Sequence, residues 1–268
     1  MTINQTSTNE RMNSVANTTP IEGDKEMNTE RRIEVKGTRT KITASKLTGW
    51  AGLSAVLSGI CYVLVGLFHP PNIASSVTTP EWAIVHVLAM GMCFFGLLGL
   101  TGIYARQAKE SGWLGLVGYL LLSLWMVLIA GFTFVEVFIL PGLATTAPSF
   151  VEGWMAMLNG TTSTMDLGGL STVWLLTAPL YMLGGLLFGI ATLRAGILPR
   201  WAAGLLTVGT VLAPVAALLP LELQPKMAVP VGLSLAWLGY ALWSERRAQA
   251  AESVPGRVNP RLRPTAAE

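Results

Sequence analysis

Charged residues are scarce in this chain of 268 residues: Asp, Glu, Lys and Arg together make up 12%. A soluble globular domain carries about a quarter. Hydrophobic residues make up 51% of the chain, and the mean hydropathy is +0.53. These proportions exclude an ordinary water-soluble domain.

Cysteine is also rare, and the sequence holds only Cys61 and Cys93, each inside an apolar segment. Two cysteines do not make a disulfide framework, and we expect both thiols to behave as small hydrophobic side chains. The sequence also lacks a P-loop, a G-x-S-x-G, C-x-x-C or H-E-x-x-H motif, and a dinucleotide-binding fingerprint after a strand. The pattern therefore indicates no particular reaction or substrate.

What the sequence does contain is long apolar segments. We expect helices at about 47–69, 81–106, 112–140, 170–195, 200–220 and 227–245. An apolar run of about 20 residues crosses the roughly 30 Å hydrocarbon core as a helix, because in lipid only a helix satisfies its own backbone polar groups. The sequence therefore predicts an all-α, multi-pass membrane helix bundle with six transmembrane helices.

Basic residues are distributed unevenly around these segments. Eight of the 18 Lys and Arg residues precede the first segment and five follow the last, while Arg106, Lys109, Arg194 and Arg200 lie in or beside alternate loops. The opposite loops hold only Lys226. Since Lys and Arg concentrate on the cytoplasmic side of a bilayer, we expect both termini to be cytoplasmic. The pI near 9.0 then reflects topology, and no nucleic-acid partner is expected.

Polar stretches flank the apolar region. Residues 1–45 and 247–268 predict disordered cytoplasmic tails around a transmembrane domain at 46–246, because they hold too little apolar surface to fold. The basic second half of the N-terminal tail is expected to contact anionic lipid. The first apolar run begins near Leu47 and is too long for a signal-peptide core, so we expect an uncleaved signal anchor.

Three of the expected helices begin alike. Each carries a tryptophan, followed by small residues and leucine, and each ends before a proline; the tryptophans are Trp50, Trp113 and Trp201. This pattern would fit three repeated helical hairpins. We favour the alternative that interfacial Trp and terminal Gly or Pro recur in membrane proteins generally.

Glycines mark the expected packing faces. They are Gly52, Gly59 and Gly66, which recur every seven residues, and the pair Gly185 and Gly189. Small residues at such spacing let helix backbones approach closely in lipid. We expect helix packing within the bundle; contact with a second copy or with another membrane protein, for which this chain would be a scaffold, is the alternative.

The segment 141–169 is long for a loop of a membrane hairpin. Ser149 to Glu152 has the form of a capping box and predicts a short interfacial helix over about 150–158. Such a helix either forms a lid over a pocket or seals the end of the bundle, and we favour the seal.

Ionisable side chains inside a membrane are costly and often functional. His69, His86 and Glu136 occur at similar depth near the outer ends of three expected helices. Glu152 and Asp166 lie on the same expected side and complete a candidate polar cluster. No catalytic residue is assigned.

This cluster has three interpretations. His69, His86 and Glu136 would suit Zn²⁺ with an open fourth position, as in a membrane-embedded metal-dependent enzyme. The same groups would bind and release protons, since histidine titrates near neutral pH. In the plainest interpretation, which we favour over the other two, Glu136 pairs with a histidine or extends to the interface, and the histidines hydrogen-bond there. We favour a non-enzymatic transport-associated or sensing protein with an outer-facing polar pocket and no cofactor, although the nearly apolar middles of the helices disfavour transport by this chain alone.

Three short motifs carry a resemblance to known proteins over about residues 45–245. They are Trp50-Ala51-Gly52-Leu53, His69-Pro70-Pro71 and Tyr104-Ala105-Arg106-Gln107. Their arrangement resembles that of uncharacterised bacterial six-helix integral membrane proteins. The resemblance implies a location in a bacterial plasma membrane and assigns no activity and no functional residue.

Overall fold

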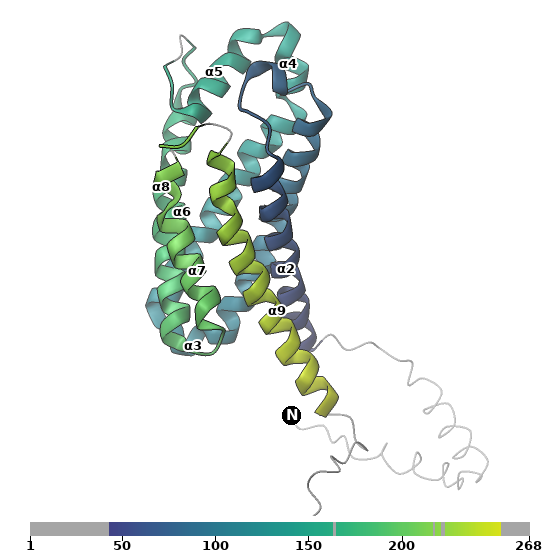
Figure 1. The fold of residues 1–268 in the computed structure, drawn as a ribbon, viewed down its shortest axis with the longest axis vertical. Helices are drawn as coiled ribbons and strands as arrows, with labels where there is room; N and C mark the ends of the chain where they lie inside the picture. The colour runs from purple at the N-terminus through teal and green to yellow at the C-terminus, as the bar shows by residue number, and fades with distance from the viewer. Residues whose placement is uncertain (1–42, 163–164, 217, 221–222, 253–268) are drawn as a thin grey trace, which may run out of the picture. The chain divides into compact units, whose positions relative to one another are not determined.

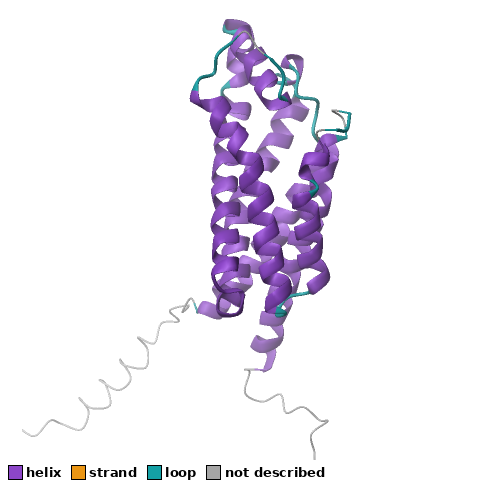
Figure 2. Ribbon diagram, turned by 90° about the vertical axis from the view of Figure 1, so that its left-hand side faces the viewer, coloured by secondary structure: helices purple, strands orange, loops and turns teal. Residues whose placement is uncertain are grey.

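A computed structural model describes residues 43–162, 165–216, 218–220 and 223–252, and within these ranges all regular secondary structure is helical (Figure 2). The elements are α2 (Ala44–Phe68), η1 (Ala74–Ser76), α3 (Pro80–Phe138), α4 (Leu140–Thr146), α5 (Pro148–Asn159), α6 (Gly169–Ala195), α7 (Arg200–Val211), α8 (Ala213–Ala216), η2 (Gln224–Ala228) and α9 (Val229–Glu252). The predicted tails lie almost wholly outside the described residues.

Four helices in the described part of the chain, rather than the six predicted, are long and apolar enough to cross a membrane. They cover Lys46–Phe68, Pro80–Phe138, Gly169–Ala195 and Gln224–Ala248. Many large apolar side chains on them are exposed, among them Phe94, Leu175 and Leu233. Because soluble proteins rarely expose so much apolar surface, the bundle fits a membrane-embedded protein.

The helix α3 contains two of the predicted spans and folds back on itself. Its 59 residues would measure about 90 Å as one straight helix. At Gly112 the backbone leaves the helical region, with φ 54° and ψ −150°, a conformation that essentially only glycine adopts. The two halves then lie side by side, since the hydroxyl groups of Thr101 and Tyr119 are 3.0 Å apart.

The predicted helix 200–220 is wrong in its length. The helix α7 ends at Val211 and the four-residue helix α8 follows it. Pro214 has no backbone N–H to donate to the preceding turn, and its ring clashes with the carbonyl of Thr210. The interruption leaves α7 with 12 residues, too short for a span by itself.

Proline and threonine set the other helix ends near the candidate site. His69 is extended, with ψ 121°, because the following Pro70 disfavours helical backbone at that position. Thr79 caps α3 by accepting a hydrogen bond from the backbone N–H of Trp82 at 3.3 Å. Pro141 in the first turn of α4 cannot continue the hydrogen bonding of α3, which ends at Phe138.

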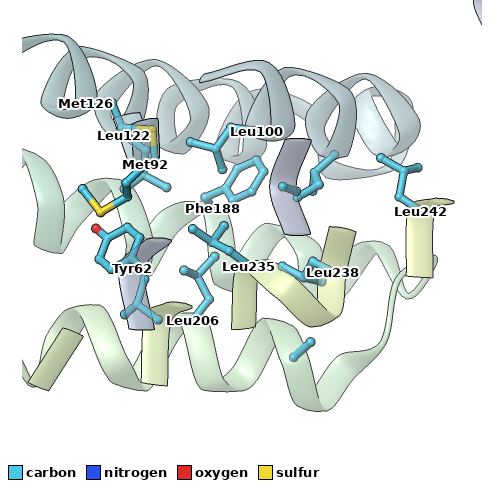
Figure 3. Packing of buried hydrophobic residues seen from close by; sticks show 14 of the residues in the cluster. Tyr62, Met92, Leu100, Leu122, Met126, Phe188, Leu206, Leu235, Leu238 and Leu242 are labelled. Atoms are coloured by element: carbon cyan, nitrogen blue, oxygen red, sulfur yellow. The ribbon is translucent and has the colours of Figure 1, made fainter. Parts of the chain in front are cut away.

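The long helices pack in a closed ring. In the order α2, α3, α6, α7 and α9, each contacts the next, and α9 contacts α2. Figure 3 shows the core inside this ring, where Phe188 from α6, Leu206 from α7 and Leu238 from α9 belong to one hydrophobic cluster. The packing therefore brings the first and last described helices together.

The glycines predicted for helix packing lie at helix contacts within the chain. A Cβ atom at Gly52 would lie 2.8 Å from the backbone nitrogen of Trp243 in α9, and Gly59 and Gly66 also face α9 or η2. Gly185 and Gly189 face threonines of α7. The α2 glycine stripe is therefore covered by this chain's own helix.

The two ends of the bundle differ in charge. Seven of the eight described Lys and Arg residues lie at the end that holds the α3 turn and the start of α2, here called the basic end; they are Lys46, Arg106, Lys109, Arg194, Arg200, Arg246 and Arg247. Trp50, Trp113 and Trp201 are 68%, 81% and 83% exposed there. The opposite end, here called the cap end, carries α4, α5 and the segment 69–79 (Figure 1).

Candidate functional site: a buried histidine and carboxylate at the cap end

The fold-back of α3 brings together two ionisable side chains that are 50 positions apart in the sequence. His86 lies in the second turn of α3 and Glu136 in its last turn. The imidazole Nε2 of His86 is 3.4 Å from Oε2 of Glu136. The two residues are only 2% and 7% exposed, so the pair is screened from solvent.

The hydrogen bonding of His86 fixes the chemistry of this pair. Its Nδ1 atom lies 2.7 Å from the carbonyl oxygen of Trp82. Because a carbonyl only accepts, Nδ1 carries a proton, and Nε2 is the nitrogen that faces Glu136. A hydrogen bond between Nε2 and Oε2 needs a proton on the carboxyl group or on the imidazole, because otherwise two acceptor atoms face each other. Charging one member alone would cost several kcal/mol at a buried position.

Two indoles hold the pair in place. The Nε1–H group of Trp154 in α5 donates to Oε1 of Glu136 at 3.3 Å, and Nε1–H of Trp82 donates to the backbone carbonyl of Glu136 at 2.9 Å. The ring of Trp82 also stacks on the imidazole of His86, with 3.9 Å between ring centroids. Each end of α3 is therefore tied to the other through the pair and its neighbours.

His69 lies beside the pair at the end of α2. Its ring centroid is 5.0 Å from that of His86, and its Nδ1 lies 2.7 Å from the carbonyl oxygen of Pro70. Burial lowers the pKa of His69 below its ordinary value, against the hydrogen bond to Pro70, which raises it. His69 is partly exposed and His86 is buried, so His69 is the more accessible of the two imidazoles.

A second hydrophobic cluster closes the site. It contains Trp82, Phe132, Leu140, Val151, Trp154 and Met155, from both halves of α3 and from α4 and α5. The predicted interfacial helix corresponds to α5, preceded by a second short helix, α4. The capping box is wrong: α5 begins at Pro148 after Ala147, and no side chain caps it, because the helix starts before Ser149.

Of the five predicted site residues, the structure brings together His69, His86 and Glu136. Glu152 is exposed on α5. Asp166 is also exposed, and its carboxylate accepts a hydrogen bond from the backbone N–H of Gly168 at 2.7 Å. Asp166 lines a separate pocket of about 310 Å³, whose lining includes none of the other four residues.

The surroundings of the pair hold few other ionisable groups. On the elements packed around it, the titratable groups toward the cap end are His69, Glu81 and Glu152, and both acids are exposed. Within the described ranges, no group of three or more His, Cys, Asp or Glu residues is arranged to hold a metal ion. The structure thus offers no three-ligand set for the zinc alternative.

The sequence interpretation missed the two indoles. Trp82 precedes His86 by four residues, which places both side chains on one helix face and was a usable signal. Trp154 gave no such signal, because its contact with Glu136 depends on how α5 folds over the bundle.

Comparisons with protein-family models, with curated proteins and with solved structures give no match for this chain. The resemblance to bacterial six-helix membrane proteins therefore stays a prediction.

Proposed function

We propose that this chain is an integral plasma-membrane protein with a sensing or transport-associated role, in which the pair of His86 and Glu136 exchanges one proton with the outer side. The observation that carries the proposal is the geometry of the pair. Nε2 of His86 faces Oε2 of Glu136 at 3.4 Å, while Nδ1 of the same ring is committed to a backbone carbonyl. A buried pair of this kind holds one proton and changes its charge when it gains or loses one.

The orientation follows from the segregation of the cations. Since Lys and Arg concentrate on the cytoplasmic side, the basic end is cytoplasmic and the cap end faces outward. Lys46 and Arg246 lie at the same end, which requires an even number of crossings. We propose six, with α3 crossing twice and with α7 and α8 contributing to the fifth.

Sensing is the role that the packing supports better than transport. The pair is enclosed by the cluster to which α5 contributes. Deeper in the bundle, the buried hydroxyl groups of Ser58, Thr210 and Ser234 donate to backbone carbonyls rather than to one another. Protonation or deprotonation of Glu136 changes the strength of the hydrogen bond that its carboxyl group accepts from Trp154. The packing of α5 against α3 would therefore depend on the protonation state.

Replacing Glu136 by glutamine tests the proposal. The amide keeps the shape of the side chain, accepts from Trp154 through its oxygen and donates to Nε2 of His86 through its nitrogen, but carries no exchangeable carboxyl proton. We expect the variant to fold with a melting temperature close to that of the natural chain. In infrared difference spectra recorded between pH 4 and pH 9 in lipid nanodiscs, the band of a buried carboxyl group should disappear.

The matched control is Glu152→Gln, which removes an exposed acid from α5 and should leave that band intact. A buried carboxyl band that persists in the Glu136→Gln variant would contradict the proposal. Severe loss of expression in Glu136→Gln, with no spectral change in the protein recovered, would instead show a purely structural role.

A further inference from the structure

A pocket of about 280 Å³ lies at the basic end, between the first turns of α2 and the last turns of α9. Its lining is Lys46, Gly49, Trp50, Leu53, Trp243, Arg246 and Arg247, and it is here called the α2–α9 pocket. Beside the pocket the two helices are tightly packed, because a Cβ atom at Gly52 would lie 2.8 Å from the backbone nitrogen of Trp243. Figure 1 shows that α9 extends past the beginning of α2 at the basic end.

The charge of the pocket is positive. Three of its seven lining residues are cations and none is an acid. The nearest acid of α9, Glu245, is held away by Arg106 in α3, whose Nε lies 3.0 Å from one carboxylate oxygen and whose terminal nitrogen lies 2.5 Å from the other. The carboxylate of Glu245 pairs with Arg106 and also interacts with Arg246. The positive charge offered by the pocket therefore rests on Lys46 and Arg247.

The apolar part of the lining suits a molecule that is half buried in the membrane. Trp50 and Leu53 are exposed side chains on the surface of α2. The guanidinium of Arg247 lies 4.8 Å from the ring centroid of Trp243, which holds that cation over an aromatic face. Cations beside exposed tryptophan and leucine are the chemistry expected where phosphate groups meet acyl chains.

The geometry points to the α2–α9 pocket as a binding site for the phosphate-bearing headgroup of an anionic phospholipid of the inner leaflet. Lys46 and Arg247 contact the phosphate, Trp50 lies at the level of the glycerol, and Leu53 contacts the first part of an acyl chain. This site is formed by the folded helices and is distinct from attraction of lipid to the N-terminal tail. It depends on the membrane orientation proposed above and not on the proton chemistry at the cap end.

The test uses the full chain, purified in neutral detergent and stripped of lipid, with binding measured by native mass spectrometry. We expect phosphatidylglycerol to bind with saturation and phosphatidylcholine to bind far more weakly. The double variant Lys46→Gln/Arg247→Gln should lower the affinity for phosphatidylglycerol at least about tenfold, since each cation near a bilayer surface contributes to anionic lipid binding. Arg247→Gln alone should give a smaller loss.

The matched control is Arg194→Gln/Arg200→Gln, which removes two cations from the same end outside the pocket and should change the affinity by no more than about twofold. Equal losses in the two double variants would overturn the proposal in favour of general charge attraction. Equal binding of the two lipids would also overturn it. Displacement of phosphatidylglycerol by millimolar inorganic phosphate would assign the pocket to a soluble anion instead.

Discussion

The absence of a side chain at Gly59 allows α2 and α9 to pack closely. A Cβ atom there would lie 2.5 Å from the backbone nitrogen of Ala236 and would also meet the carbonyl of Gly232. Backbone atoms of a packed helix cannot turn aside as the end of a flexible side chain can. The helices must therefore separate if the side chain grows.

We expect Gly59→Ala to destabilise the bundle by about 1–3 kcal/mol, the usual cost of overpacking. For a protein of this size that loss lowers the melting temperature by several degrees. The chain provides its own reporter: Cys93 is buried and Cys61 is partly buried, so a fluorogenic maleimide reacts as the bundle opens.

Gly131→Ala is the control for this prediction, because Gly131 in α3 has no atom near the position of a Cβ. It should leave the melting temperature unchanged or raise it slightly, since alanine favours helix. Equal melting temperatures for Gly59→Ala and the natural chain would show that α2 and α9 are not packed as closely as described.

At the candidate site, the sequence predicted the depth of the ionisable residues along their helices but not which side chains contact one another. Each residue of a helix advances 1.5 Å, so the sequence alone placed His69, His86 and Glu136 at a common depth. Their contact required the relative rotation of the two halves of α3, which depends on tertiary packing. The donor Trp154 reaches Glu136 from α5, whose position over the bundle is not encoded in any local pattern.

Among the elements, α3 is the one whose geometry depends most on one residue. Gly112 turns the chain by adopting φ 54° and ψ −150° between two apolar spans. A side chain at this position meets no neighbouring atom, so the constraint is conformational rather than steric crowding from other helices.

We expect Gly112→Ala to cost about 1–3 kcal/mol, because non-glycine residues rarely adopt this backbone conformation. The reaction of the two cysteines with maleimide on heating should begin at a temperature several degrees lower than in the natural chain. Gly142→Ala in α4 is the control, since Gly142 also has open space but no positive φ. An unchanged melting temperature in Gly112→Ala would mean that the turn adopts another conformation.

Hydropathy predicted where most helices lie but not how continuous they are. The expected helix 170–195 matches α6, Gly169–Ala195, because apolar length and the loops that flank it define it well. The expected helix 200–220 is interrupted near Pro214. Hydropathy did not predict this break, because the hydropathy of a segment does not depend on whether its backbone hydrogen bonds are continuous. The start of α5 was misplaced because Ser149, two residues before Val151, lies inside the helix rather than at its cap.

For the whole molecule, the separation of charge predicts which end can be reached from outside the cell. Lys109 lies at the basic end and Lys226 at the cap end, and both are exposed. In intact cells, a membrane-impermeant maleimide should label Lys226→Cys at once and Lys109→Cys only after permeabilisation.

The natural chain is the control for labelling, because Cys61 and Cys93 lie within the bundle and should react little. The reverse pattern would invert the proposed orientation. Labelling of both positions from outside would contradict a bundle that spans the membrane.

The three exposed tryptophans are expected to anchor the basic end of the bundle at the headgroup region of the bilayer. Trp50, Trp113 and Trp201 all project at the basic end, where indoles favour the headgroup region. When the hydrocarbon layer thins or thickens, a helix bundle anchored on one side accommodates the mismatch at its other side. Lateral tension or a change in acyl-chain length would therefore displace the lipid headgroups relative to α4 and α5. The depth of the His86 and Glu136 side chains below the membrane surface would change with it.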